Sequence, residues 1–160
     1  DENEPVTGGW DFKWVPLYSN YTINNNAEYG KEDDYMYLVA ITGYAGSNDF
    51  GSMVFSTQNK VNLNGLSEIV VSWEAFKPMY DFDAGARLVI GLSENKPPDV
   101  GLPSEFLDSY VEFEQEIFDV RENSLNVSEL NGEYYLYVLA YQTGSSRKGG
   151  VNIFEVRGEI

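Results

Sequence analysis

The sequence predicts an all-β protein, an antiparallel β-sandwich of the jelly-roll type with about nine strands. Apolar and polar residues alternate in short stretches separated by turn-rich segments, which is the pattern of half-buried strands. No segment has a convincing helical periodicity. Long irregular connections occur among the shorter turns, and the absence of cysteine excludes the Cys…Trp…Cys pattern of immunoglobulin domains. A jelly roll is therefore favoured over an immunoglobulin-type sandwich.

The strongest strand prediction falls on Asn131–Gln142, NGEYYLYVLAYQ. Its residues alternate between two apolar faces: Tyr134, Leu136, Val138 and Ala140 on one, and Tyr135, Tyr137, Leu139 and Tyr141 on the other. A strand that is apolar on both faces is normally covered on both, or exposes one of them to a partner. We expect the other strands to be arranged around this one.

Three strands are expected in the first third of the chain, because each stretch is rich in β-formers and bounded by turn residues: Trp10–Val15, Tyr35–Thr42 and Ser52–Thr57. Pro16 is expected to end the first of them, because proline cannot donate a ladder hydrogen bond. The Asn- and Tyr-rich segment Leu17–Lys31 is expected to be a loop.

Four further strands are expected after residue 60, on the same grounds: Ile69–Phe76, Ala86–Ser93, Ser109–Val120 and Val151–Glu159. The third of these alternates apolar residues with glutamates, which predicts one solvated acidic face. Prolines and glycine make Glu94–Asp108 the longest irregular crossover, in which Ser104–Leu107 forms at most a helical turn.

Two segments share a pattern, Val61–Val70 (VNLNGLSEIV) and Leu125–Tyr134 (LNVSELNGEY). In each, a short half-buried strand is expected to end in an Asx- or Ser-type turn, because these side chains bond to nearby backbone groups. Leu66 and Leu130 are then expected to fold back and close the edge of the core. We interpret this as one structural solution used twice, since a duplication should extend further.

Composition suits one domain with a proper core, because the chain has 160 residues, 42% of them hydrophobic. The first nine residues, DENEPVTGG, are acidic and polar, so we expect 1–9 to be the remnant of a linker and 10–160 to be the sandwich domain. No apolar run approaches the roughly 20 residues that a membrane-spanning helix needs.

The acidic excess is large, with 26 acidic and 10 basic residues and a formal charge of −16. Such a field repels phosphate backbones and anionic lipids, so neither nucleic acid nor a membrane is expected as a partner. Solubility accounts for most of this charge. Clustered carboxylates also suit calcium, and Glu32, Asp33 and Asp34 or Asp81 and Asp83 are weak candidates for a structural site. No other cofactor is expected.

The absence of both Cys and His excludes thiol nucleophiles, Ser-His-Asp triads and zinc sites with nitrogen or sulfur ligands. An enzyme would have to rely on carboxylates alone, as a glycosidase does with two acids about 5–10 Å apart. Acids are so abundant that no pair stands out, although Asp81, Asp83 and Glu116 are examples. We therefore expect a protein without catalytic residues.

Three stretches in this order, NKVNLNGLSEIVVSWEAF, ARLVIGLSE and SLNVSELNGEYYLYVLAY, carry a resemblance to a known family. Together they resemble jelly-roll, galactose-binding-like domains of tail and baseplate proteins from phages of Gram-positive bacteria. Similar domains occur in secreted bacterial cell-wall proteins and resemble carbohydrate-binding modules. The resemblance covers roughly Asp34 to Glu159. It implies a non-catalytic module that attaches a virion or a secreted protein to a bacterial surface glycan, hence an extracellular or virion-surface location, and it transfers no binding residues.

Sugar recognition needs flat aromatic faces together with carboxylates, amides or Arg for the hydroxyl groups. Three loops and one tryptophan offer such side chains: Tyr80, Asp81, Phe82 and Asp83 in one loop, Tyr44, Asn48 and Asp49 in a second, Tyr141 and Arg147 in a third, and Trp14. If the sandwich brings these loops to one end, they form a shallow site. Trp73, inside a strand pattern, is expected in the core.

A structural role is the alternative, as a capsid decoration or as a fibre or baseplate spacer that contacts other virion proteins without binding sugar. Its interface would use the acidic faces or a stripe of four tyrosines, Tyr35, Tyr37, Tyr135 and Tyr137, because tyrosine is enriched at interfaces. Cover by the N-terminal segment of the chain would explain the same stripe.

Overall fold

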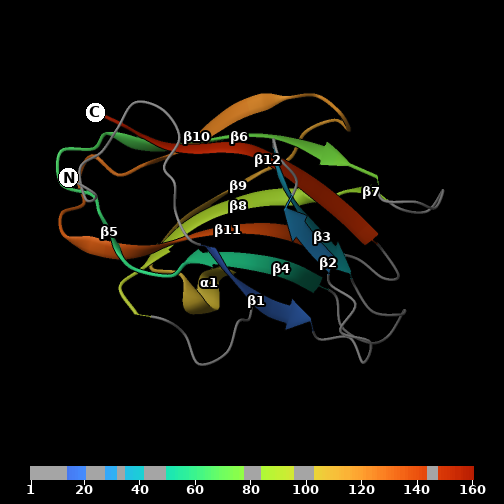
Figure 1. Ribbon diagram of the computed structural model, residues 1–160, viewed down its shortest axis with the longest axis horizontal. Helices are drawn as coiled ribbons and strands as arrows, with labels where there is room; N and C mark the ends of the chain where they lie inside the picture. Colours follow the sequence, from blue (N-terminus) through green and yellow to red (C-terminus); the bar gives the residue numbers. More distant parts are fainter. Residues whose placement is uncertain are drawn as a thin grey trace.

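Two sheets packed face to face make up the computed structural model, which describes residues 14–20, 28–31, 35–41, 50–77, 84–95, 103–143 and 148–160 (Figure 1). The first sheet has the order β1 (Trp14–Asn20), β4 (Phe50–Thr57), β11 (Glu133–Thr143), β8 (Arg87–Ser93) and β9 (Ser109–Phe113), with β5 (Val61–Asn62) also on β11. The second has the order β10 (Arg121–Asn126), β6 (Glu68–Phe76), β12 (Lys148–Glu159), β3 (Met36–Ile41) and β2 (Glu28–Lys31), with β7 (Ala84–Gly85) also on β12.

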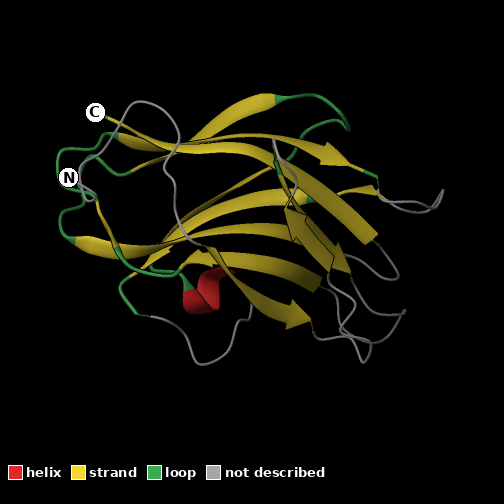
Figure 2. Cartoon of the chain, viewed as in Figure 1, coloured by secondary structure: helices red, strands yellow, loops and turns green. Residues whose placement is uncertain are grey.

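The predicted fold class is confirmed. Nine of the described strands have five or more residues, and β2, β5 and β7 are shorter. Strand pairs within both sheets are antiparallel, apart from the two-residue parallel pairing of β7 with β12. Strands dominate the described chain, as Figure 2 shows, and its one helix is the short α1 (Pro103–Phe106). No described helix has the length and apolar character needed to span a membrane.

The main core lies between the two sheets. It takes alternate residues of β11, namely Leu136, Val138 and Ala140, and the inward residues of β6. Trp73 has no exposed surface, as predicted, and its Nε1–H donates to Oδ1 of Asn123 at 2.8 Å. That hydrogen bond satisfies the indole N–H, which would otherwise be costly to bury.

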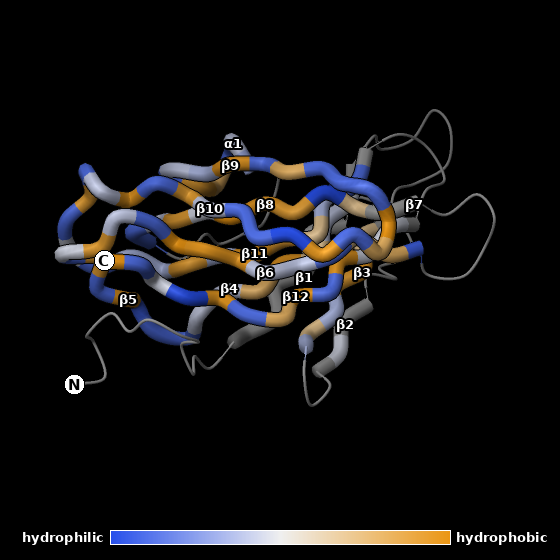
Figure 3. Tube along the Cα trace, turned by 90° about the horizontal axis from the view of Figure 1, so that it is seen from above, coloured by the Kyte–Doolittle hydropathy of each residue, from blue (hydrophilic) through white to orange (hydrophobic). Residues whose placement is uncertain are grey.

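The other face of β11 is also covered, as its pattern predicts. Val54, Val89, Phe106, Leu107, Tyr137, Leu139 and Tyr141 form a second buried cluster on the outer face of the first sheet. The cover comes from α1 and the residue after it, in the crossover that follows β8. Gly91, the cross-strand partner of Tyr137, leaves the space that Leu107 occupies, since a Cβ on Gly91 would lie 2.5 Å from Cδ1 of Leu107. Apolar residues are accordingly concentrated on β8 and β11 (Figure 3).

The two similar segments form similar turns that lie side by side. In the first, the Asn64 N–H donates to Oδ1 of Asn62, and in the second the Ser128 N–H donates to Oδ1 of Asn126, both at 2.9 Å. The turns also contact each other, because the Gly132 N–H donates to Oδ1 of Asn64 at 2.8 Å. The Asx turns that the sequence predicts are thus confirmed, and the pair closes one end of the sandwich.

Three predictions about the elements are wrong. Pro16 does not end a strand but lies within β1 opposite Phe55, which is possible because β1 is an edge strand. The expected loop Leu17–Lys31 includes the end of β1 and all of β2. The expected strand Ser109–Val120 stops at Phe113, and the chain then turns toward β6, where the Phe118 N–H donates to the Ala75 carbonyl at 2.8 Å.

Candidate binding face

The loop residues singled out from the sequence mostly lie outside the described residues: Tyr44, Asn48, Asp49, Tyr80, Asp81, Phe82, Asp83 and Arg147. Trp14 begins β1, but its side chain is not described. Tyr141 is described and is only 8% exposed. The Arg87 guanidinium lies 5.0 Å from the centre of its ring, so little of that ring is accessible to a partner.

The strand ends that flank these three loops lie together at one end of the sandwich, on the right in Figure 1. Ile41 at the end of β3 pairs with Lys148, and Thr143 at the end of β11 pairs with Phe50. Gly85 of β7 pairs with Gly150 in the same region of β12. The loops therefore start and finish near one another, and the convergence of their side chains stays a prediction.

A different group of aromatic residues lies on the outer face of the second sheet, which we call the ring face. Its rings are Tyr35, Tyr37, Phe76 and Phe154, and its polar side chains include Ser72, Glu74 and Asn152. Alternation places them there, because the intervening residues Met36, Trp73, Ala75, Val151 and Ile153 pack in or against the core between the sheets. The ring face is thus on the side of the second sheet opposite to the core, and its rings are partly exposed.

Two of the rings lie over glycines. A Cβ on Gly30 would be 2.3 Å from Cε1 of Tyr37, its cross-strand partner. A Cβ on Gly150 would be 2.3 Å from Cε1 of Phe76. Only glycine leaves this space, so the two rings lie against the backbone of the sheet.

The β-bulge in β12 adds a third ring. The pairing of β12 with β6 shifts between Ile153 and Glu155, so that Phe154 is the extra residue. Phe154 is 37% exposed, and its ring packs edge-on against Tyr35 with the two ring centres 6.0 Å apart. The bulge therefore places Phe154 and Glu155 on the same face of the sheet.

A polar pair lies on the same face as these two rings, on β12 and β6. Asn152 is the cross-strand neighbour of both Tyr37 and Glu74, so the three form one row across β3, β12 and β6. Its Nδ2–H donates to Oε1 of Glu74 at 3.0 Å. Within the described part of the chain, Oε2 of Glu74 has no hydrogen-bond partner, so this oxygen remains available as an acceptor.

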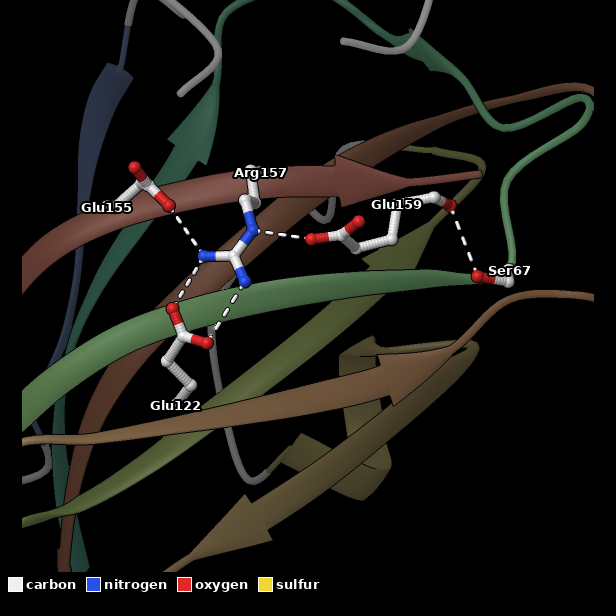
Figure 4. A network of polar contacts seen from close by, with 5 residues as sticks. All are labelled: Ser67, Glu122, Glu155, Arg157 and Glu159. Atoms are coloured by element: carbon white, nitrogen blue, oxygen red, sulfur yellow. Dashed lines mark hydrogen bonds and ion pairs between the residues drawn. The ribbon is translucent and has the colours of Figure 1, made fainter. Parts of the chain in front are cut away.

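Farther along the same face, Arg157 is surrounded by glutamates (Figure 4). Its guanidinium contacts Glu122 of β10 through two nitrogens, at 2.7 and 3.0 Å, and binds Glu155 and Glu159 at 2.6 Å each. The hydrogen bond to Glu122, followed by those to Glu159 and Glu155, raises the pKa of Arg157, and the same bond lowers the pKa of Glu122. This cluster crosses β6 and ties the edge strand β10 to β12.

The expected stripe of four tyrosines does not exist. Tyr35 and Tyr37 belong to the second sheet, whereas Tyr135 and Tyr137 lie on β11 in the first. Tyr137 has no exposed surface, because Phe106 of α1 packs edge-on against it at 5.7 Å. The cover that the structure describes over Tyr137 therefore comes from the crossover before β9, and cover by the N-terminal segment stays a prediction because residues 1–13 lie outside the described ranges.

The described residues contain no group of three or more acidic side chains that could hold a metal ion. The two weak calcium candidates, at residues 32–34 and at Asp81 and Asp83, lie outside the described ranges, so the possibility of calcium there stays a prediction. The expectation that residues 1–9 are a linker remnant is likewise untested.

Sequence reasoning missed the ring face, apart from its mention of Tyr35 and Tyr37. Phe76 and Glu74 were assigned to a strand without a functional role, and Asn152 was not singled out. The available signal was glycine inside strand patterns, at Gly30 and Gly150, because such a glycine often marks the close approach of another group. Which ring would fill each space depends on the register between strands.

Comparisons with known proteins bear on the fold. No protein-family model matches the sequence, and a sequence search of curated proteins finds no match. Among solved structures, the chain is similar to TmCBM61 in complex with β-1,4-galactotriose, with a TM-score of 0.51, 11% identity, and coverage of 90% of this chain and 86% of that one. At this identity the likeness shows the fold alone, which is the sandwich of a carbohydrate-binding module.

The chain is also similar to the structure of the glycoside hydrolase domain of Endo-D from Streptococcus pneumoniae R6, with a TM-score of 0.53 and 12% identity. That match covers 94% of this chain but only 22% of the other, so the sandwich corresponds to a small part of a larger protein. The enzymatically active domain of tailspike protein 4 from bacteriophage CBA120 matches with a TM-score of 0.46 and 11% identity over 91% of this chain and 19% of that one, which is too weak to support an inference.

Proposed function

We propose that the chain is a non-catalytic carbohydrate-binding module and that it holds its glycan on the ring face. The observation that carries this proposal is that Tyr37 and Phe76 lie over glycines on the same face of the sheet as the hydrogen-bonded pair Glu74 and Asn152. Flat apolar faces suit the apolar side of a pyranose, and the carboxylate and amide suit its hydroxyl groups. The fold shared with TmCBM61 supports the same function.

The spacing of the rings suits an extended ligand. Gly30 and Gly150, which lie beneath the two rings, are separated by two strand spacings and one pleat repeat. From standard sheet dimensions this is about 12 Å. A short oligosaccharide laid across β3 and β12 would contact both rings, with the polar pair beside it on β12 and β6.

In its biological setting, we propose that the module attaches a phage virion or a secreted protein to a glycan on a bacterial surface, which would place it outside the cell or on the virion. The resemblance over Asp34 to Glu159 supports this setting. The loop residues of the sequence analysis remain candidates for additional contacts, because the strand ends beside their loops lie near Phe76.

Titration calorimetry of the whole chain against a panel of soluble polysaccharides tests the function. Tyr37→Ala and Phe76→Ala are each expected to lower the affinity for a bound glycan by about tenfold, which is typical when one aromatic anchor is removed. Tyr110→Ala is the matched control, since Tyr110 is 37% exposed but lies on β9 in the first sheet. The affinity of the Tyr110→Ala variant for the glycan should equal that of the original protein.

Two results would contradict the proposal. One is an absence of binding across the panel by a protein whose thermal unfolding shows that it is folded. The other is binding that survives both ring substitutions unchanged, because the glycan would then be held elsewhere, for example by the loops around Tyr44 or Tyr80.

The alternative, a structural or interaction module, is favoured by one observation. Ile117, Phe118 and Val120 are 39%, 66% and 55% exposed in the connection between β9 and β10, which is an apolar surface suited to a protein partner. Light scattering distinguishes the two functions. A stable trimer without glycan affinity would favour the structural role, and a monomer that binds glycan would exclude it.

A further inference from the structure

The charges on the ring face limit which glycans it can accept. Arg157 is the one cation among the described side chains on this face, and three glutamates surround it (Figure 4). Four of its five N–H donors are already used by these glutamates, whose three negative charges outweigh its own, so it offers little attraction to a carboxylate, sulfate or phosphate on a sugar. The face therefore has no described partner for an acidic glycan.

Glu74, unlike Arg157, is not surrounded by groups of opposite charge among the described residues. It is partly buried on β6, two residues from Phe76 on the same face, and Asn152 occupies only one of its carboxylate oxygens. The second oxygen has no partner in the described part of the chain. A free carboxylate oxygen next to aromatic rings is suited to an ammonium group, which can donate to the oxygen while the attached sugar rests on a ring.

The field of the whole chain acts in the same direction. A formal charge of −16 raises the local concentration of cations and lowers that of anions. An acidic glycan would approach this face against repulsion, whereas a glycan with amino groups would be attracted to it. The preference should weaken with salt, because screening shortens the range of the field.

We propose that the ring face selects glycans that carry a free amino group, with the ammonium on the Glu74 carboxylate and the pyranose rings against Tyr37 and Phe76. This inference rests on the proposed glycan-binding function and adds the chemical class of the ligand. It ranks amino-bearing glycans first, uncharged glycans second and acidic glycans last.

Three oligosaccharide probes of equal length test this order by calorimetry at about pH 6, where a free amine is protonated. They are a chitosan oligomer, its N-acetylated counterpart and an oligogalacturonate. The amine is expected to bind about fivefold more tightly than its acetylated counterpart, the size of a partly exposed ion pair. The oligogalacturonate should show no binding.

The Glu74→Gln variant separates charge from shape. It keeps an acceptor for Asn152 but loses the negative charge, so the fivefold preference should disappear while the N-acetylated oligomer still binds. Glu129→Gln is the control, because Glu129 is exposed in a turn away from the ring face and the change in net charge is the same. Thermal unfolding checks that both variants fold.

Each outcome has one meaning. Equal affinity for amine and N-acetylated probes, or a preference that survives Glu74→Gln, overturns this inference and leaves the glycan-binding function intact. Tight binding of the oligogalacturonate also overturns it. Failure of all three probes, together with no response to any neutral polysaccharide, overturns both the inference and the proposed function.

Discussion

Tyr137 provides the sharpest test of the packing beneath α1. Its hydroxyl is fully buried and has no hydrogen-bond partner in the described part of the chain. Ser56 lies opposite on β4 but donates its own proton to the Thr57 carbonyl at 2.9 Å, and no contact between the two hydroxyls has hydrogen-bond geometry. An unpaired buried hydroxyl costs about 1–3 kcal/mol. Tyr137→Phe removes that cost and keeps the ring against Phe106.

We therefore expect Tyr137→Phe to increase the free energy of unfolding by about 1 kcal/mol and the melting temperature by about 2–4 °C. Urea denaturation followed by tryptophan fluorescence measures the first quantity, and the slope should stay unchanged. Tyr135→Phe is the matched control, because Tyr135 is the next tyrosine on the same face and is only partly buried. That variant should show no comparable gain.

The pH dependence supplies a second readout. Burial raises the pKa of Tyr137 to about 12 from an ordinary value of 10.0, against a smaller opposing effect of Ser56. The neutral ring is therefore favoured in the folded state, and this stability is complete below pH 10 and lost as the pH rises toward 12. The loss amounts to about 2–3 kcal/mol and should be absent from Tyr137→Phe. A variant that is less stable than the original protein, or that keeps the whole alkaline loss, would refute the reasoning.

Three further substitutions test other features. Arg157→Met should lower the melting temperature. The deficit should shrink below pH 4.5, because the lowered pKa of Glu122 stabilises the fold above pH 4.5 and this contribution is lost in acid. Melting curves recorded across this pH range measure the change in the deficit. Gly91→Ala should cost about 1–3 kcal/mol in urea denaturation, since its Cβ would lie 2.5 Å from Leu107, and an unchanged stability would show that the α1 segment moves aside. Phe118→Gly should stabilise the fold by up to about 1 kcal/mol in urea denaturation, because the φ of 62° at this position is strained for any residue with a Cβ. Phe118→Ala, which keeps a Cβ, should show no gain in the same assay.

Much of the fold follows from local patterns. The double alternation of Asn131–Gln142 predicts a strand covered on both faces, and β11 is covered by the core on one face and by α1 with Leu107 on the other. The Asx turns at Asn62 and Asn126 are also local, since each side chain bonds to the backbone two residues later. Such features depend on neighbours in sequence, and composition and spacing can therefore predict them.

Pro16 and the four tyrosines show where local patterns mislead. Proline disfavours a strand interior, but at the edge its missing donor faces no partner, and β1 continues through it. Tyr35, Tyr37, Tyr135 and Tyr137 look alike in sequence, yet two are on one sheet and two on the other. Strand order decided both outcomes, and strand order is a property of the whole sandwich.

The sequence alone determined the all-β class, the main strands, the central position of β11, and a net charge that disfavours acidic partners. The tertiary structure alone decided that Gly30 lies beneath Tyr37 and Gly150 beneath Phe76, and that Asn152 bonds to Glu74 on the same face. The physical reason is register. A shift of one residue between β3, β12 and β6 would turn these side chains into the core, and no local pattern in the sequence specifies how three distant strands align.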